Sequence, residues 1–228
     1  MTTNRSDGME TRRRLLDAAG AVFAAKGFHD TKIAEICRMA EANIAAVNYH
    51  FGSKEELYVE TWRHAFARSI EAHPPDGGVP ASAPAEDRLR GQIVALMHRM
   101  MDPNNLDFDI AHKEMANPSG LLVEVMHRSI EPLRQQLITV VRELLGVQAT
   151  AQHVRLCEMS IQAQCFAPLF HERQQRESTA RGKPSGLPAL DIDIDVLAEH
   201  IFQFSLAGIH SLRAKLASKA RQQRERKV

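Results

Sequence analysis

An uncharged segment between positions 43 and 49 has side chains suited to the base edges of a DNA duplex. The amide of Asn48 both donates and accepts hydrogen bonds, so it can pair with adenine in a bidentate way. The small side chains of Ala45 and Ala46 would let a helix backbone approach the bases closely, and Tyr49 can contact a thymine methyl group or a phosphate. Similar segments occur in helical proteins that bind no DNA. The segment alone therefore leaves both interpretations open.

The residues that precede this segment predict two helices. The first helix, from Thr11 to Lys26, is stopped by Gly27, and its inward face is Leu15, Ala19, Val22 and Phe23. Thr31 is predicted to cap a short second helix, whose inward face is Ile33, Ile36, Cys37 and Ala40.

A third short helix and a long fourth helix follow. Asn43 is predicted to cap the third helix, with Ile44, Val47 and Phe51 facing inward. The sequence from Ser53 to Glu56 has the S-x-x-E pattern of a capping box, and it begins a helix that runs toward His73. Two short helices joined by a tight turn are typical of a helix-turn-helix, which places its second helix in the major groove.

The rest of the chain predicts an all-α protein with two domains. Hydrophobic residues make up 44% of the 228 residues and charged residues 25%, a balance typical of a globular protein with a large core. Prolines and glycines at 74–84 indicate a break between domains, and 173–188 is predicted to be a loop. We expect a DNA-binding domain at 1–57, whose last helix continues to about 73, and a helical domain at 74–228. Its helices are predicted at 86–101, 104–116, 119–145, 151–172 and 194–219.

Charge and cysteine content give weaker indications. The net charge is only +1, so attraction to DNA must come from local patches such as Arg12 to Arg14. A second basic group lies in the tail, where a solvated helix end is the simpler interpretation: Arg221, Arg224, Arg226 and Lys227. The three cysteines form no CxxC pair, and no stretch reaches the roughly 20 apolar residues of a membrane span. We expect a cytoplasmic protein that has no membrane partner.

The segment AEANIAAVNYHFGSKEEL, from Ala40 to Leu57, closely resembles the signature of the TetR family of transcriptional regulators. The resemblance covers about the first 57 residues. With the segments SIQAQCF (160–166) and HIFQFSLAGI (200–209), it is similar to the CecR-like subgroup. Two departures stand out: Glu41 replaces the usual turn glycine, where a left-handed conformation would cost about 1 to 2 kcal/mol, and Asn48 replaces a frequent aromatic residue.

The family resemblance implies that Lys54 and His50 bind phosphate, and that Tyr49 contacts the backbone or a base. Packing between helices is an equally good explanation for His50. The expected DNA-contacting residues are Thr31, Asn43, Ala45, Ala46, Asn48, Tyr49, His50 and Lys54.

The same resemblance implies a C-terminal bundle that forms a homodimer and binds a small-molecule inducer. The stripe expected at the dimer interface is Leu197, Ile201, Phe204, Gly208 and Leu212, although burial within one subunit would also explain it. The residues expected around the ligand combine adaptable methionines with aromatic and polar groups: Met97, Met101, Phe108, His112, Met115, Met126, His127 and Phe166. Core packing is the alternative for the methionines. No metal site and no cofactor are expected.

The sequence thus predicts a transcriptional regulator, a repressor that a small molecule releases from palindromic double-stranded operator DNA. The sequence has no G-x-S-x-G motif and no P-loop, so an enzyme is not expected. The alternatives are a helical partner-binding protein without DNA activity and, less favoured, a helical enzyme.

Overall fold

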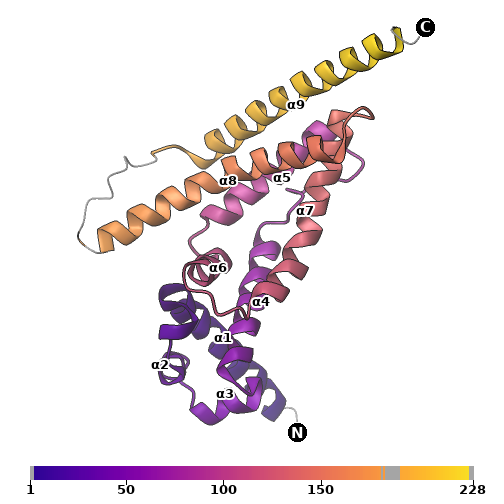
Figure 1. Cartoon of the computed structure of the whole chain (residues 1–228). Helices are drawn as coiled ribbons and strands as arrows, with labels where there is room; N and C mark the ends of the chain where they lie inside the picture. Colours follow the sequence, from indigo (N-terminus) through magenta and orange to yellow (C-terminus); the bar gives the residue numbers. More distant parts are fainter. Residues whose placement is uncertain (1–2, 181, 183–190, 226–228) are drawn as a thin grey trace. The chain divides into compact units, whose positions relative to one another are not determined.

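The computed structural model describes residues 3–180, 182 and 191–225, and these residues form nine α-helices and no strand (Figure 1). This confirms the predicted all-α class. The helices are α1 (Thr3–Asp30), α2 (Ile33–Met39), α3 (Ile44–Phe51), α4 (Lys54–Ala72), α5 (Ala85–Met101), α6 (Asp107–Ala116), α7 (Val123–Leu145), α8 (Ala151–Ala180) and α9 (Ile194–Glu225). None of the described helices is both long enough and apolar enough to cross a membrane.

Several helix ends differ from the prediction. Helix α8 continues to Ala180, so the expected loop at 173–188 is wrong for 173–180. The reason is that glycine and proline first occur at Gly182 and Pro184, and the polar residues before them are compatible with a helix. Positions 181 and 183–188 of that loop lie outside the described residues, as do Arg226 and Lys227 of the tail. Helix α1 is regular up to Gly27, where a φ of 75° interrupts it as predicted.

The chain divides into two compact units. The first contains Met1–Ala72 and Asp102–Ile130, and the second contains His73–Met101 and Glu131–Val228. The predicted domain boundary near residue 74 therefore does not coincide with the boundary between the two units, because α6 and the start of α7 pack with the first four helices. The predicted break at 74–84 is nevertheless non-helical.

The core of the first unit is built from the predicted inward faces of α1 and α2 together with α4, α6 and the start of α7. Leu15, Ala19, Val22 and Phe23 are all buried, as the periodicity predicts. The rings of Phe23 and Tyr58 meet edge to face, with centroids 4.7 Å apart. Helix α4 is fixed to α6 by two hydrogen bonds: the Trp62 indole donates to the carbonyl of Asp107 at 3.2 Å, and the Tyr58 hydroxyl donates to Glu114 at 3.0 Å.

In the second unit, α5 packs against α8 and α9. Two glycines allow the 74–84 segment to lie directly on α5: a Cβ on Gly77 would lie 2.5 Å from the carbonyl oxygen of Gly91, and one on Gly91 would lie 2.6 Å from that of Asp76. Because these neighbours are backbone atoms, neither position can accept a larger residue without moving the segment.

Candidate nucleic-acid interface

Helices α2 and α3 form a helix-turn-helix whose turn contains a strained residue. Glu41 has a φ of 51°, so it adopts the left-handed conformation that the usual glycine of this position would adopt freely. Its carboxylate lies 4.0 Å from Arg14 of α1. Asn43 caps α3 as predicted, because its side-chain oxygen accepts the backbone N–H of Ala46 at 2.8 Å.

The outer face of α3 presents uncharged side chains to solvent. Ala45, Asn48 and Tyr49 are exposed, and Tyr49 is 84% exposed. Val47 and Phe51 are buried on the opposite side, which confirms that part of the predicted inward face. The side chain of Asn48 is therefore accessible from solvent.

Two sequence predictions about this region need correction. Thr31 does not cap α2: its side chain is buried, and its hydroxyl donates to the carbonyl of Gly27 at 2.7 Å. That bond joins Thr31 to the end of α1 and leaves it unavailable to a phosphate. Ile44 does not face inward but is 54% exposed, because it begins α3 and extends beyond the core that Val47 and Phe51 cover. Ala46 is only partly exposed and packs against the core.

His50 and Lys54 are both partly buried. The ring of His50 meets that of Tyr49 edge to face, with centroids 4.9 Å apart. The ammonium group of Lys54 lies over the Phe28 ring, 4.4 Å from its centroid, at the first residue of α4. Burial lowers the pKa of Lys54 from its usual value. The capping role of Ser53 is confirmed by the hydrogen bond from the Glu56 backbone N–H to its hydroxyl at 3.1 Å.

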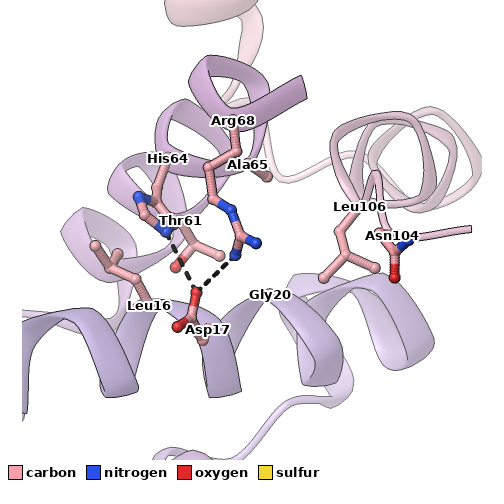
Figure 2. Close-up of a pocket in the computed structure, with 9 residues that line it drawn as sticks. All are labelled: Leu16, Asp17, Gly20, Thr61, His64, Ala65, Arg68, Asn104 and Leu106. Carbon is pink, nitrogen blue, oxygen red and sulfur yellow. Dashed lines mark hydrogen bonds and ion pairs between the residues drawn. The ribbon is translucent and has the colours of Figure 1, made fainter. Parts of the chain in front are cut away.

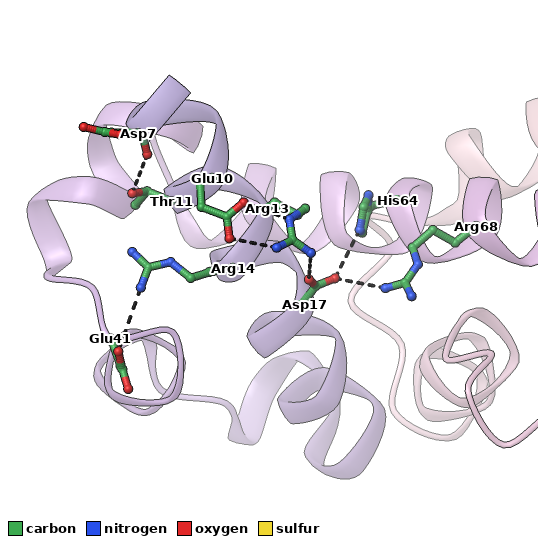
Figure 3. A network of polar contacts seen from close by, with 9 residues as sticks. All are labelled: Asp7, Glu10, Thr11, Arg13, Arg14, Asp17, Glu41, His64 and Arg68. Atoms are coloured by element: carbon green, nitrogen blue, oxygen red, sulfur yellow. Dashed lines mark hydrogen bonds and ion pairs between the residues drawn. The ribbon is translucent and has the colours of Figure 1, made fainter. Parts of the chain in front are cut away.

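The arginines of the predicted basic patch lie next to acidic side chains, and Figure 3 shows two of them, Arg13 and Arg14. Arg12 binds Glu60 at 2.9 Å, and Arg13 binds Glu10 at 2.7 Å. Arg14 lies 4.0 Å from the carboxylate of Glu41. Each arginine of the patch therefore has an acidic neighbour within the first unit.

Two other cations have no ion pair in the part of the chain that the structure describes. Lys32 lies at the start of α2 and Arg38 in its last turn, and both are exposed. Sequence reasoning missed these residues because they do not form a run of basic residues. Their positions at the two ends of α2, the helix that precedes α3, could have identified them.

Asp17 joins α1 to α4 at a small cavity. Its carboxylate accepts a hydrogen bond from Arg68 at 3.1 Å and lies 3.3 Å from His64 Nε2, both on α4 (Figures 2 and 3). Arg13 approaches the other carboxylate oxygen at 3.6 Å. The adjacent cavity has a volume of about 80 Å³ and is lined by Leu16, Asp17, Gly20, Thr61, His64, Ala65, Arg68, Asn104 and Leu106 (Figure 2). It is much smaller than a typical ligand pocket of about 300 Å³ or more.

The residues expected to surround a ligand are divided between the two units. Met97, Met101 and Phe166 lie in the second unit, and the others lie in the first: Phe108, His112, Met115, Met126 and His127. Met97 is completely buried, as a core residue would be, whereas Met115 is 62% exposed. The described residues hold no group of three or more His, Cys, Asp or Glu side chains placed to bind a metal.

The predicted dimer stripe is only partly exposed. Phe204 is 65% exposed, and a Cβ on Gly208 would meet no atom within 4 Å. Ile201 is buried in the core of its own unit, so its assignment to a partner interface is corrected; Leu197 and Leu212 are partly exposed. Phe204 and Gly208 line a groove of about 270 Å³ between α8 and α9, together with Leu156, Cys157, Ser160, Ile161, Gln164, Ser205 and Ile209.

Replacing Glu41 with glycine is expected to raise the free energy of unfolding by about 0.5 to 1 kcal/mol. Relief of about 1 to 2 kcal/mol of left-handed strain exceeds the entropy that glycine adds to the unfolded chain, which costs about 0.5 to 1 kcal/mol. Urea titration followed by circular dichroism measures the change. The Glu41→Ala variant is the control, because it loses the exposed contact with Arg14 but keeps the strain. Equal stability of the two variants would show that the turn is unstrained.

The fold and the site together define an all-helical protein of the helix-turn-helix class. Residues 15–61 match the family model for bacterial regulatory proteins of the tetR family. Residues 85–209, more than half of the chain, match the model described as the C-terminal domain of HTH-type transcriptional dual regulator CecR. The chain therefore belongs to the TetR family, with a C-terminal domain of the CecR type.

Individual relatives agree with this assignment. The HTH-type transcriptional dual regulator CecR of Shigella flexneri is 29% identical over 153 residues, which cover 62% of this chain and 68% of the relative. The HTH-type transcriptional repressor NicS of Pseudomonas putida is 39% identical over 62 residues, which are 27% of this chain and only 29% of the relative. A solved structure of a putative transcriptional regulator from Pseudomonas aeruginosa PAO1 has the same fold, with a TM-score of 0.67 and 18% identity over 90% of this chain and 93% of that one.

Proposed function

We propose that the protein is a DNA-binding transcriptional regulator that binds a pseudo-palindromic operator as a homodimer and represses the adjacent gene. The observation that carries this proposal is the exposed, uncharged face of α3, with Asn48 at its centre. Lys32 and Arg38 of the preceding helix are exposed and have no ion pair among the described residues, so they add positive charge to the same unit. A two-fold dimer places two copies of α3 about one helical turn apart on the duplex, and it therefore selects a palindrome.

Selection from a random duplex library tests this function. The expected result is an enriched sequence with two inverted half-sites, which the protein then shifts in electrophoresis when the sequence is placed upstream of a reporter gene. Light scattering should show a dimer at micromolar concentration. Failure to enrich any sequence, or a stable monomer in solution, would refute the proposal.

Asn48→Ala should reduce discrimination at one base pair in each half-site by about 1 to 3 kcal/mol, because the bidentate amide is lost. Affinity for random duplex DNA should remain almost unchanged. Binding titrations on the selected operator and on single-position variants measure the effect. Equal weakening on operator and random DNA would mean that Asn48 does not contact a base.

Lys54→Ala should weaken binding to every duplex sequence and lower the slope of log K against log salt by about one unit. This follows if the ammonium group at the N-terminus of α4 neutralises one phosphate. Titrations between low and moderate salt measure the slope, and Lys26→Ala serves as the control because Lys26 is already paired with Glu35 at 2.7 Å. An unchanged slope would remove Lys54 from the phosphate-binding set.

A small molecule is proposed to release the repressor. The C-terminal domain type supports this proposal. The coupling is expected to be about 1 to 3 kcal/mol, and operator DNA must weaken ligand binding by the same factor. Calorimetric titration of a compound found by thermal-shift screening, with and without operator, tests the coupling. Identical affinities would refute release by that compound.

A further inference from the structure

The first residue of α3 is an isoleucine that the core does not use. Ile44 is 54% exposed, whereas Val47 and Phe51 on the same short helix are buried. Ile44 lies four positions before Asn48, so the two side chains are neighbours on one face of the helix. Asn43 caps the helix immediately before it and fixes the start of α3.

The surroundings of Ile44 favour a base contact over a phosphate contact. Its exposed neighbours on α3 are Ala45, Asn48 and Tyr49, none of which carries a charge. An aliphatic side chain has no hydrogen bond to offer a phosphate. The apolar group that a duplex presents in its major groove is the 5-methyl group of thymine.

We propose that Ile44 is a specificity-determining residue that packs against a thymine methyl group next to the base pair contacted by Asn48. This inference rests on the proposed function, because it requires α3 to lie in the major groove. The contact would add a preference for thymine that neither the Asn48 amide nor the phosphate contacts provide. A thymine is therefore expected at a fixed position in both half-sites.

Removal of that methyl group tests the proposal directly. Deoxyuridine has the same hydrogen-bonding groups as thymidine but lacks the methyl group, so it isolates the apolar contact. Burial of one methyl group corresponds to about fourfold in affinity, or about 15-fold when both half-sites of a dimer lose it. The selected operator is synthesised with deoxyuridine at symmetric thymine positions, one position at a time.

The expected result is a loss of about 15-fold at one thymine position for the wild-type protein. The Ile44→Ala variant should bind the unmodified operator less tightly and lose less than about twofold on the same replacement, because the contact is already absent. Ile44→Val should retain part of the effect. Met39→Ala is the matched control, since Met39 is 55% exposed in the same unit and lies at the end of α2. The Met39→Ala variant should show the same loss of about 15-fold on deoxyuridine replacement as the wild-type protein.

A thermal unfolding measurement shows whether a change in DNA binding comes from a loss of folded protein. Because Ile44 is exposed, Ile44→Ala should unfold at the wild-type temperature. Equal deoxyuridine effects in wild type and Ile44→Ala at every position, or no effect in the wild type, would overturn the role of Ile44 while leaving specific DNA binding intact. A library that yields no preferred sequence would instead overturn the proposed function itself.

Discussion

Gly208→Trp is expected to convert the protein to a monomer. A Cβ at this position would meet no atom within 4 Å, so a side chain can begin there without displacing its neighbours. It will instead fill the groove between α8 and α9, beside the exposed ring of Phe204. Leu156, which lines the same groove on α8, is also exposed, at 53%. A partner that packs on this apolar surface will be excluded.

Loss of the dimer should reduce operator affinity by about 10³-fold or more, toward the level of non-specific binding, because one recognition helix contacts only a half-site. Sedimentation equilibrium measures the association, and fluorescence anisotropy measures DNA binding. Ala217→Trp is the matched control, since Ala217 is exposed on the opposite side of α9. A Gly208→Trp protein that remains dimeric would show that this surface is not the interface.

The second large effect is expected at Glu114, which is buried and accepts hydrogen bonds from several donors. Its carboxylate accepts the Tyr58 hydroxyl at 3.0 Å, the backbone N–H and hydroxyl of Ser119, and the backbone N–H of Gly120 at 2.9 Å. Burial and the neighbouring carboxylate of Glu114 both raise the pKa of Tyr58, so the hydroxyl stays protonated and donates. Glu114 thus connects α4, the end of α6 and the loop before α7.

Glu114→Ala should lower the free energy of unfolding by about 3 to 5 kcal/mol, because it leaves several buried donors without an acceptor. This is a large part of the 5 to 15 kcal/mol that stabilises a typical domain. Urea denaturation measures the change. Glu124→Ala is the control: its side chain is 69% exposed and pairs with Arg128, so the loss should stay below about 1 kcal/mol. A loss that small at Glu114 would contradict the assigned role.

Local chemistry predicted much of the DNA-binding unit. The inward faces of α1 and α2 follow from apolar spacing, and the caps at Asn43 and Ser53 follow from side chains that satisfy backbone N–H groups near the helix start. The left-handed conformation of Glu41 was also predictable from the family pattern. Each of these features depends on residues only a few positions apart.

The sequence predictions that were wrong concern features that depend on contacts between distant segments. The pairing of Arg12 with Glu60, 48 positions away, cannot be found from a run of basic residues. The apolar spacing predicted that Ile44 faces the core, but Ile44 is exposed. Spacing alone does not show where a helix extends past the elements that it packs against. The residues expected around a ligand remain a prediction; they were grouped by their distance along the chain, and the 102–130 segment packs in a different unit from Met97 and Phe166.

The internal pairing of Arg12, Arg13 and Arg14 also affects how such a protein would search a genome. Each phosphate contact releases counterions and holds a protein equally on any sequence, so cations already bound to Glu60, Glu10 and Glu41 add little to that hold. An arginine that must first leave its carboxylate gains less from a phosphate, so these three residues are expected to add little to residence on random DNA. Occupancy of the operator then depends mainly on the uncharged face of α3.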